Sequence, residues 1–164
     1  MLINPELAKA MNAQIGNEFG ASMQYLSIAG HFHTQKLTLL SKLFFEQAEE
    51  EKTHAMKFAH YILDTQGDLQ IPAIAAPKPK FASAEEAVKA ALAWEQEVTE
   101  QIKALMDMAV SQNDYLAQNF LQWFIDEQLE EINKMDQLLS VIQRAGEKNL
   151  LMVEAYLLHI EKAG

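Results

Sequence analysis

Four stretches of this 164-residue chain repeat apolar residues at the spacing of an α-helix. Side chains three and four positions apart share one helix face, so each stretch predicts a helix that turns one side to a core. The predicted helices span about residues 5–33, 38–65, 84–112 and 115–145, and a short, strongly apolar fifth one spans about 149–162. No β-rich alternating segment is apparent. We therefore expect an all-α protein in which residues 1–164 form a single domain, with a four-helix bundle over about 4–145.

Start and stop signals agree with these limits. The segment Asn4-Pro5-Glu6 is typical of an N-cap followed by proline at the first helical position. Ser83 and Glu86 have the spacing of a capping box, and Asn113-Asp114 can cap the fourth helix. Gly146 ends the fourth helix. The fifth helix is too apolar to stand exposed, so we expect it to pack against partners in an oligomer.

Residues 66–82 separate the second and third helices and hold three of the four prolines. Proline disrupts a helix interior, so this segment cannot be helical. Extended, it would reach about 55 Å at about 3.3 Å per residue, whereas a helix of about 28 residues is about 42 Å long. We expect a crossover that runs the length of the bundle, so that helices two and three start at the same end. The alternative is a flexible linker between two hairpins, but neither hairpin alone would bury its apolar stripe.

The amino-acid composition limits the kinds of partner and metal site that the chain can have. The chain has 13 basic and 23 acidic residues, a formal net charge of −10, which favours cations and argues against nucleic acid or an anionic membrane. The absence of cysteine excludes disulfides, thiolate zinc sites and iron–sulfur clusters. The start of the chain lacks the features of a signal peptide, and no apolar run approaches about 20 residues, so we expect a cytoplasmic protein.

Polar residues interrupt the apolar stripe of every long helix near its middle. They are Glu18, Glu51, His54, Glu95, Gln128 and Glu131. Taken singly, each has an ordinary interpretation, because a glutamate at a core edge extends to water and a lone histidine is usually hydrogen-bonded. In an up-down bundle, however, the midpoints are level, so all six would converge on one layer. Buried carboxylates without cations would weaken the fold, and carboxylates with an imidazole suit iron or manganese, so we predict a di-metal site.

The motifs around these residues resemble the ferritin family, and more closely its prokaryotic non-haem ferritins. The resemblance covers the whole chain, including the crossover and the fifth helix. Its most specific parts are Asn17-Glu18-Phe19 with Tyr25, residues 47–54 (QAEEEKTH), Trp94-Glu95 and residues 119–131 (NFLQWFIDEQLEE). The resemblance implies a ferritin-like four-helix bundle with a long crossover and a short C-terminal helix.

The resemblance also implies roles for individual residues. Glu18, Glu51 and His54 would hold the first iron of a ferroxidase centre. Glu51 would bridge to a second iron held by Glu95 and Glu131, with Gln128 close by. A third iron site near the inner surface would use Glu50, Glu127, Glu130 and Glu131, although Glu49, Glu50, Glu127 and Glu130 could equally form a solvated acidic face. Tyr25 matches a tyrosine that the family keeps beside the centre as a one-electron donor.

The function implied is oxidation of Fe2+ by O2 or H2O2 and storage of ferric oxyhydroxide mineral in a hollow homo-oligomeric shell, a 24-mer in the family. A bacterioferritin would carry a methionine for haem directly after the bridging glutamate, where this chain has Lys52, so no haem is expected. The smaller mini-ferritins lack the fifth helix. Two other classes stay open: a rubrerythrin-like di-iron peroxidase or oxidase without storage, and a structural bundle or metal buffer that never oxidises iron.

Overall fold

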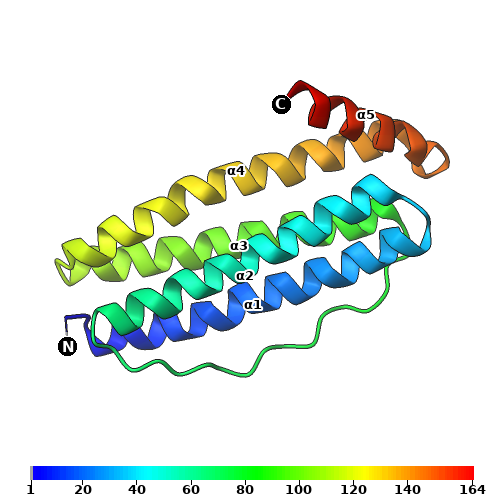
Figure 1. The fold of residues 1–164 in the computed structure, drawn as a ribbon. Helices are drawn as coiled ribbons and strands as arrows, with labels where there is room; N and C mark the ends of the chain where they lie inside the picture. Colours follow the sequence, from blue (N-terminus) through cyan, green and yellow to red (C-terminus); the bar gives the residue numbers. More distant parts are fainter. Residues whose placement is uncertain (1) are drawn as a thin grey trace.

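The computed structural model describes residues 2–164 and consists of helices joined by loops (Figure 1). In chain order the elements are α1 (Pro5–Thr34), α2 (Thr38–Asp64), α3 (Ala84–Ser111), α4 (Tyr115–Ala145), the 3₁₀ turn η1 (Glu147–Asn149) and α5 (Leu150–Ala163). No strand occurs among residues 2–164. The all-α prediction is confirmed, and the helix limits agree with the predicted ones to within a residue.

Side chains hold the helix starts where the sequence signals predict. The Asn4 side chain accepts a hydrogen bond from the backbone N–H of Glu6, and Asp114 caps α4 in the same way. Ser83 accepts from the backbone N–H of Glu86 at 3.0 Å. One detail differs from a standard capping box, because the Glu86 carboxylate accepts from the N–H of Ala82 and not from that of Ser83.

The helices pair as two hairpins, α1 with α2 and α3 with α4, and α1 also lies against α3 (Figure 1). Residues 66–82 contain neither helix nor strand and run along the bundle from the end of α2 to the start of α3. As predicted, α2 and α3 therefore start at the same end of the bundle. This arrangement makes the midpoints of all four helices level.

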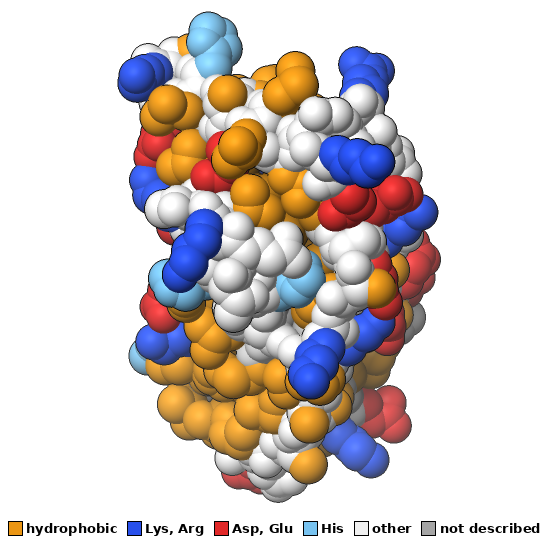
Figure 2. All heavy atoms as spheres, turned by 90° about the vertical axis from the view of Figure 1, so that its right-hand side faces the viewer, with side chains coloured by type: hydrophobic (Ala, Val, Ile, Leu, Met, Phe, Trp, Pro, Cys, Tyr) orange, Lys and Arg blue, Asp and Glu red, His pale blue; other side chains and the backbone are white. Residues whose placement is uncertain are grey.

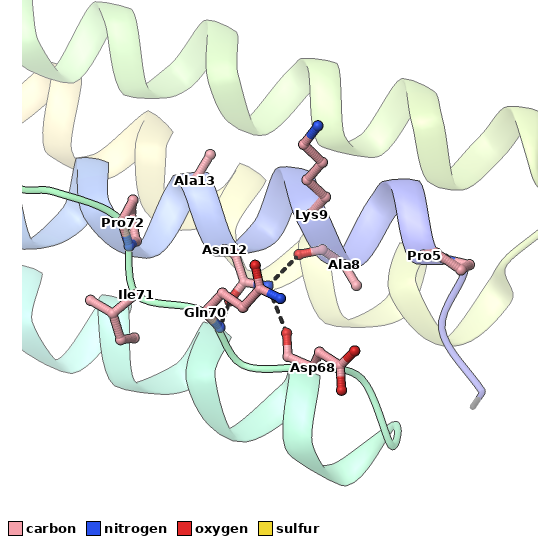
Figure 3. A pocket seen from close by; sticks show the side chains of 9 residues that line it. All are labelled: Pro5, Ala8, Lys9, Asn12, Ala13, Asp68, Gln70, Ile71 and Pro72. Carbon is pink, nitrogen blue, oxygen red and sulfur yellow. Dashed lines mark hydrogen bonds between the residues drawn. The ribbon is translucent and has the colours of Figure 1, made fainter.

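Contacts with α1 fix the crossover in place (Figure 3). The buried Asn12 side chain donates to the backbone carbonyl of Asp68 and accepts from the backbone N–H of Gln70, both at 2.8 Å. Pro72 rests on Gly16, where an added Cβ would lie 2.5 Å from Pro72 Cγ, so a residue larger than glycine would push the crossover away. These contacts argue against the flexible linker that the sequence left as an alternative.

The apolar core of the bundle is split into two clusters, one towards each end. The residues that border the gap are Ile15, Ala55, Val98 and Phe124 on one side and Ala21, Ala48, Ala91 and Met135 on the other. Each helix contributes one residue to each border. The gap therefore crosses all four helices at one level, which is where the sequence places its polar interruptions.

The C-terminal segment is attached to the bundle by two carboxylates. Glu154 accepts hydrogen bonds from the backbone N–H groups of Leu39 and Leu40 at the start of α2, both at 2.8 Å. Glu147 accepts from the first two N–H groups of α3, at 3.1 and 3.0 Å. Each carboxylate thus satisfies backbone donors that a helix start leaves without partners.

The outward side of α5 is apolar. Leu151 and Met152 are 75% and 66% exposed. Figure 2 shows the end of the bundle from which α5 rises, with apolar side chains uncovered at the top, towards α5. Across residues 2–164, none of the helices combines the length and the apolar character that a membrane span requires.

Candidate metal centre

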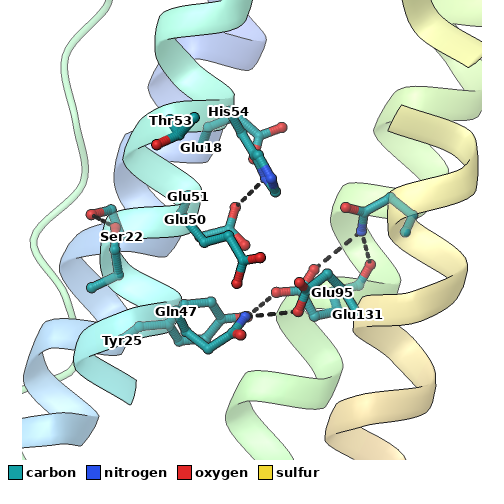
Figure 4. Close-up of polar contacts among 12 residues, drawn as sticks. Glu18, Ser22, Tyr25, Gln47, Glu50, Glu51, Thr53, His54, Glu95 and Glu131 are labelled. Atoms are coloured by element: carbon teal, nitrogen blue, oxygen red, sulfur yellow. Dashed lines mark hydrogen bonds and ion pairs between the residues drawn. The ribbon is translucent and has the colours of Figure 1, made fainter. Parts of the chain in front are cut away.

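The gap between the two apolar clusters is filled by the polar residues that interrupt the predicted stripes (Figure 4). Glu18, Glu51, His54, Glu95, Gln128 and Glu131 are each at most 2% exposed. They come from α1, α2, α3 and α4, so every helix of the bundle contributes. Four carboxylates, an imidazole and an amide thus share a space closed by apolar residues on both sides.

Glu18, Glu51 and His54 form the first group. Each offers a ligand atom, and these atoms lie within 4.8 Å of one another. His54 Nδ1 is 3.3 Å from Glu51 Oε2, and Gln14 Nε2 donates to Glu18 Oε1 at 2.8 Å. The remaining oxygens, Glu18 Oε2 and Glu51 Oε1, are buried without a hydrogen-bond partner among residues 2–164. Orphaned oxygens of this kind are destabilising in charged carboxylates unless a proton or a cation neutralises them.

Glu51, Glu95 and Glu131 form the second group, again with ligand atoms within 4.8 Å of one another. The Tyr25 hydroxyl donates a hydrogen bond to Glu95 Oε1, and Gln128 Nε2 donates to Glu95 Oε2 at 3.1 Å. These two donors hold the Glu95 carboxylate from opposite oxygens. Because Glu51 belongs to both groups, its carboxylate is placed to bridge two cations.

Burial of the layer raises the pKa values of its four glutamates. Burial raises the pKa of Glu18 and of Glu51 well above the usual range, and repulsion from neighbouring carboxylates adds to both shifts. Burial also raises the pKa of Glu95, against the hydrogen bonds from Tyr25 and Gln128. The pKa of Glu131 rises to about 7, chiefly through burial. Charge in this layer is therefore unfavourable without a cation, and a bound cation reverses that preference.

Tyr25 is fully buried beside the second group. Burial and the nearby carboxylates, Glu95 first, raise the pKa of its hydroxyl well above the ordinary value. The phenol consequently keeps its proton and acts as a donor to Glu95 at any physiological pH.

A third group lies next to the second. Glu50, Glu127 and Glu131 have carboxylate oxygens within 4.8 Å of one another, and Glu50 and Glu127 are half-buried. Glu130 is exposed and belongs to none of the three groups found among residues 2–164. Of the four glutamates that the resemblance assigns to a third site, the structure thus brings three together and turns Glu130 to solvent. The roles of these residues stay predictions.

Three polar residues around the layer were not assigned a role by the sequence: Gln14, which donates to Glu18, and the residues Gln47 and Lys134. Gln47 is fully buried, and its Nε2 donates to Glu131 Oε2 at 2.7 Å. Lys134 Nζ donates to Gln47 Oε1 and lies 3.5 Å from Glu50 Oε2 and 4.0 Å from Glu131 Oε1. A weak signal existed, because Lys134 follows Glu131 by three positions and helical residues at that spacing are neighbours.

Aromatic rings position the histidine. The His54 ring meets Trp123 and Phe124 edge to face, with centroids 5.4 and 5.8 Å apart. Both aromatic residues come from α4, opposite the helix that carries His54. Packing against two rings restricts the rotation of the imidazole and keeps it beside Glu51.

The donor set suits a particular kind of cation. Carboxylate oxygens with one imidazole and no thiolate favour metals such as iron or manganese. The orphaned oxygens of Glu18 and Glu51 have lone pairs available to coordinate such ions. A four-helix bundle with a long crossover and a core layer of glutamates plus a Glu-x-x-His pair is the architecture of ferritin-like proteins.

Comparison with known proteins supports the same ferritin-like architecture. The sequence model of the ferritin family, described as the ferritin-like domain, matches residues 8–145, and the chain belongs to this family. Ferritin BfrB of Mycobacterium tuberculosis is 39% identical over 146 residues, which cover 89% of this chain and 80% of that protein. The bacterial non-heme ferritin of Staphylococcus aureus is 32% identical, over 89% and 88% of the two chains. The fold is similar to that of an open pore ferritin from the archaeon Archaeoglobus fulgidus, with a TM-score of 0.91, 30% identity and coverage of 94% and 97%.

Proposed function

We propose that this protein oxidises Fe(II) in the buried carboxylate layer and stores the ferric product as oxyhydroxide mineral inside a hollow shell of identical chains. The observation that carries the proposal is the sharing of Glu51 by two groups of ligand atoms in a water-excluded core. Membership of the ferritin family and the named ferritin relatives support storage as the purpose of the oxidation.

Two adjacent binding sites have a chemical reason. Each Fe(II) gives up one electron, so a pair can reduce O2 to H2O2, or H2O2 to water, without releasing one-electron oxygen radicals. In this assignment Glu18 and His54 hold one ion, Glu95 and Glu131 hold the other, and Glu51 contacts both. Fe(II) binding displaces the protons that the raised pKa values of these glutamates retain.

Neighbouring donors keep the ligands in position. Gln14 orients Glu18, and Gln47 orients Glu131, each by one hydrogen bond to a carboxylate oxygen. Tyr25 and Gln128 hold Glu95. Tyr25 is also the group best placed to supply a further electron, since its ring lies in the core beside the second group.

The third group provides a step between oxidation and storage. Glu131 belongs to both the second and the third group, and Glu50 and Glu127 reach partial exposure. A ferric ion that leaves the second group can pass along Glu131 towards these carboxylates and hydrolyse at the surface. Exposed acidic residues there would nucleate mineral.

The shell is proposed from the α5 surface and the family. Leu151 and Met152 are apolar and exposed in the single chain, as expected of residues that other subunits cover. With a net charge of −10 per chain, a 24-mer would carry about −240, which attracts Fe(II). The single-domain organisation and the cytoplasmic location remain predictions.

One experiment separates the candidate functions. Purified protein receives aerobic Fe(II) well beyond two ions per chain, and we expect a soluble amber product that elutes as a large shell containing the iron. Uptake that stops at about two ions per chain while peroxide continues to be consumed would instead indicate a rubrerythrin-like peroxidase. Binding without oxidation would indicate a metal buffer.

A further inference from the structure

Lys134 places a positive charge at the outer side of the carboxylate layer. Its ammonium nitrogen donates to Gln47 Oε1 and lies 3.5 Å from Glu50 Oε2 and 4.0 Å from Glu131 Oε1. Glu50 and Glu131 are two of the three carboxylates of the third group, whose remaining member is Glu127. The ammonium thus lies beside two of the three carboxylates that a third metal ion would need.

The contacts of Lys134 are unlike those of the lysines around it. Lys52 pairs with the exposed Glu49, and Lys42 pairs with Glu46 and Glu161, so neither reaches the three groups. Lys134 instead contacts a fully buried glutamine and a carboxylate shared by the second and third groups. Its position on α4, one turn after Glu131, directs the side chain back over that carboxylate.

Lys134 also has room to move away. Its side chain is 42% exposed and lines a cavity of about 210 Å³ between α2, α4 and α5. Gln47, Glu46 and Glu161 line the same cavity, so an ammonium that leaves Glu50 meets other oxygens there. A lysine has a flexible stem and exchanges such partners at small energetic difference.

We propose that Lys134 is an internal counter-ion of the third site, which a metal ion can fill only by displacing the ammonium. Lys134 thereby sets the affinity of the Glu50–Glu127–Glu131 site below that of the two buried sites, so that an ion passes through it and does not remain. This inference rests on the proposed function, since it concerns the site that follows oxidation. Lys134 acts here as a specificity-determining residue and not as a metal ligand.

Its test uses a metal ion that is not oxidised, so it does not depend on ferroxidase activity. Binding of Co2+ is measured by titration calorimetry at pH 7 on the assembled apo-protein and on Lys134→Gln. We expect the site of Glu18, Glu51 and His54, which Lys134 does not touch, to be unchanged, and a third site per chain to bind about tenfold more tightly in the variant, because a nearby unit charge is removed. Lys134→Arg, which keeps the charge, should bind like the original chain.

Lys52 provides the matched control for Lys134. Lys52→Gln removes the same charge from an exposed lysine that does not touch the three groups, and its third-site affinity should stay within about twofold. Equal third-site affinity in Lys134→Gln and in the original chain would overturn the inference, and so would an equal gain in Lys52→Gln. If the original chain did not bind Co2+ tightly at two sites, this result would instead refute the proposed function.

Discussion

The chain uses carboxylates in two places, at two helix starts and in the middle of the bundle, and their surroundings are opposite. At the start of α2, Glu154 accepts two backbone hydrogen bonds at 2.8 Å, and at the start of α3 Glu147 accepts two at 3.1 and 3.0 Å. In the middle of the bundle, Glu18 and Glu51 each keep an oxygen without a hydrogen-bond partner among residues 2–164. The first pair satisfies backbone donors at helix starts, whereas each carboxylate of the second pair has an oxygen that no group in the described part of the chain satisfies.

The difference shows which carboxylates the fold needs and which it tolerates. A carboxylate at a helix start satisfies free N–H groups and interacts favourably with the helix dipole, so it stabilises the chain. A carboxylate among apolar residues and other carboxylates destabilises it, as the raised pKa values of the layer express. Without a cation the carboxyls of the layer are favoured in their protonated form, and the proposed metal ions would stabilise the charged form instead.

The largest expected effect is on iron oxidation. Glu51→Gln removes the carboxylate that both groups share and should slow aerobic Fe(II) oxidation by about 100-fold or more, followed by stopped-flow absorbance. His54→Ala should also slow it greatly. The matched control is Glu100→Gln, an exposed glutamate paired with Lys103, which should leave the rate within about twofold. A Glu51→Gln rate equal to that of the original chain would remove the layer from the mechanism.

The next effect concerns stability and pH. The pKa of Glu131 rises from 4.5 to about 7 in the folded chain, so the folded state binds more protons than the unfolded state between these values. Stability of the metal-free protein therefore falls as pH rises from about 4.5 to 7, by about 3 kcal/mol for this residue. Urea unfolding of the apo-protein at pH 5 and pH 8 measures this loss together with that from the other glutamates of the layer, whose pKa values are also raised.

Glu131→Gln is the reference for that experiment, because it cannot titrate. The original apo-protein should lose about 3 kcal/mol relative to Glu131→Gln between pH 5 and pH 8. Saturating Co2+ should abolish or reverse the loss in the original chain, since the metal binds the charged carboxylates. A difference between the two proteins that stays constant with pH would show that Glu131 is not perturbed.

Removing a helix-start carboxylate should act in the other direction from neutralising the layer. Glu154→Ala frees two backbone donors and should lower the free energy of unfolding by about 2 kcal/mol, without changing the number of tight Co2+ sites. Glu161→Ala on the same helix loses only an exposed ion pair with Lys42 and should change stability by less than about 1 kcal/mol. If Glu161→Ala were as damaging as Glu154→Ala, the cap would not explain the attachment of α5.

The smallest effect belongs to Tyr25. Tyr25→Phe removes one of the two donors that hold Glu95, so the pKa of that carboxyl should rise further and Co2+ binding at the second group should weaken about threefold at pH 6. At pH 8, where protons compete less, the two proteins should bind nearly alike. Calorimetry at both pH values tests this, and a loss of affinity equal at pH 6 and pH 8 would contradict it.

Periodicity was enough to predict the fold and the burial of the layer. Glu18, Glu51, Glu95 and Glu131 lie in apolar registers three and four residues apart, and the crossover is long enough to let their helices lie level. Both inferences use only the geometry of single elements. The grouping of these residues around Glu51 then follows from packing four helices against one another.

Contacts between distant helices could not be predicted in this way. Glu147 and Glu154 cap helices that begin far away in the sequence, and their targets depend on how α5 folds back after Gly146. Lys134 and Gln47 meet across the bundle through flexible side chains whose rotamers no spacing fixes. The outward direction of Glu130 depends on the exact rotation of α4, to which a resemblance between motifs is insensitive.

Locating the bound ions tests directly whether Glu51 bridges two iron sites in the carboxylate layer. Crystals of the protein soaked anaerobically in Fe(II) give an anomalous difference map at the iron absorption edge. We expect two strong peaks per chain, one among Glu18, Glu51 and His54 and one among Glu51, Glu95 and Glu131, with Glu51 contacting both. Iron bound only outside this layer, or a single peak that Glu51 does not touch, would contradict this expectation.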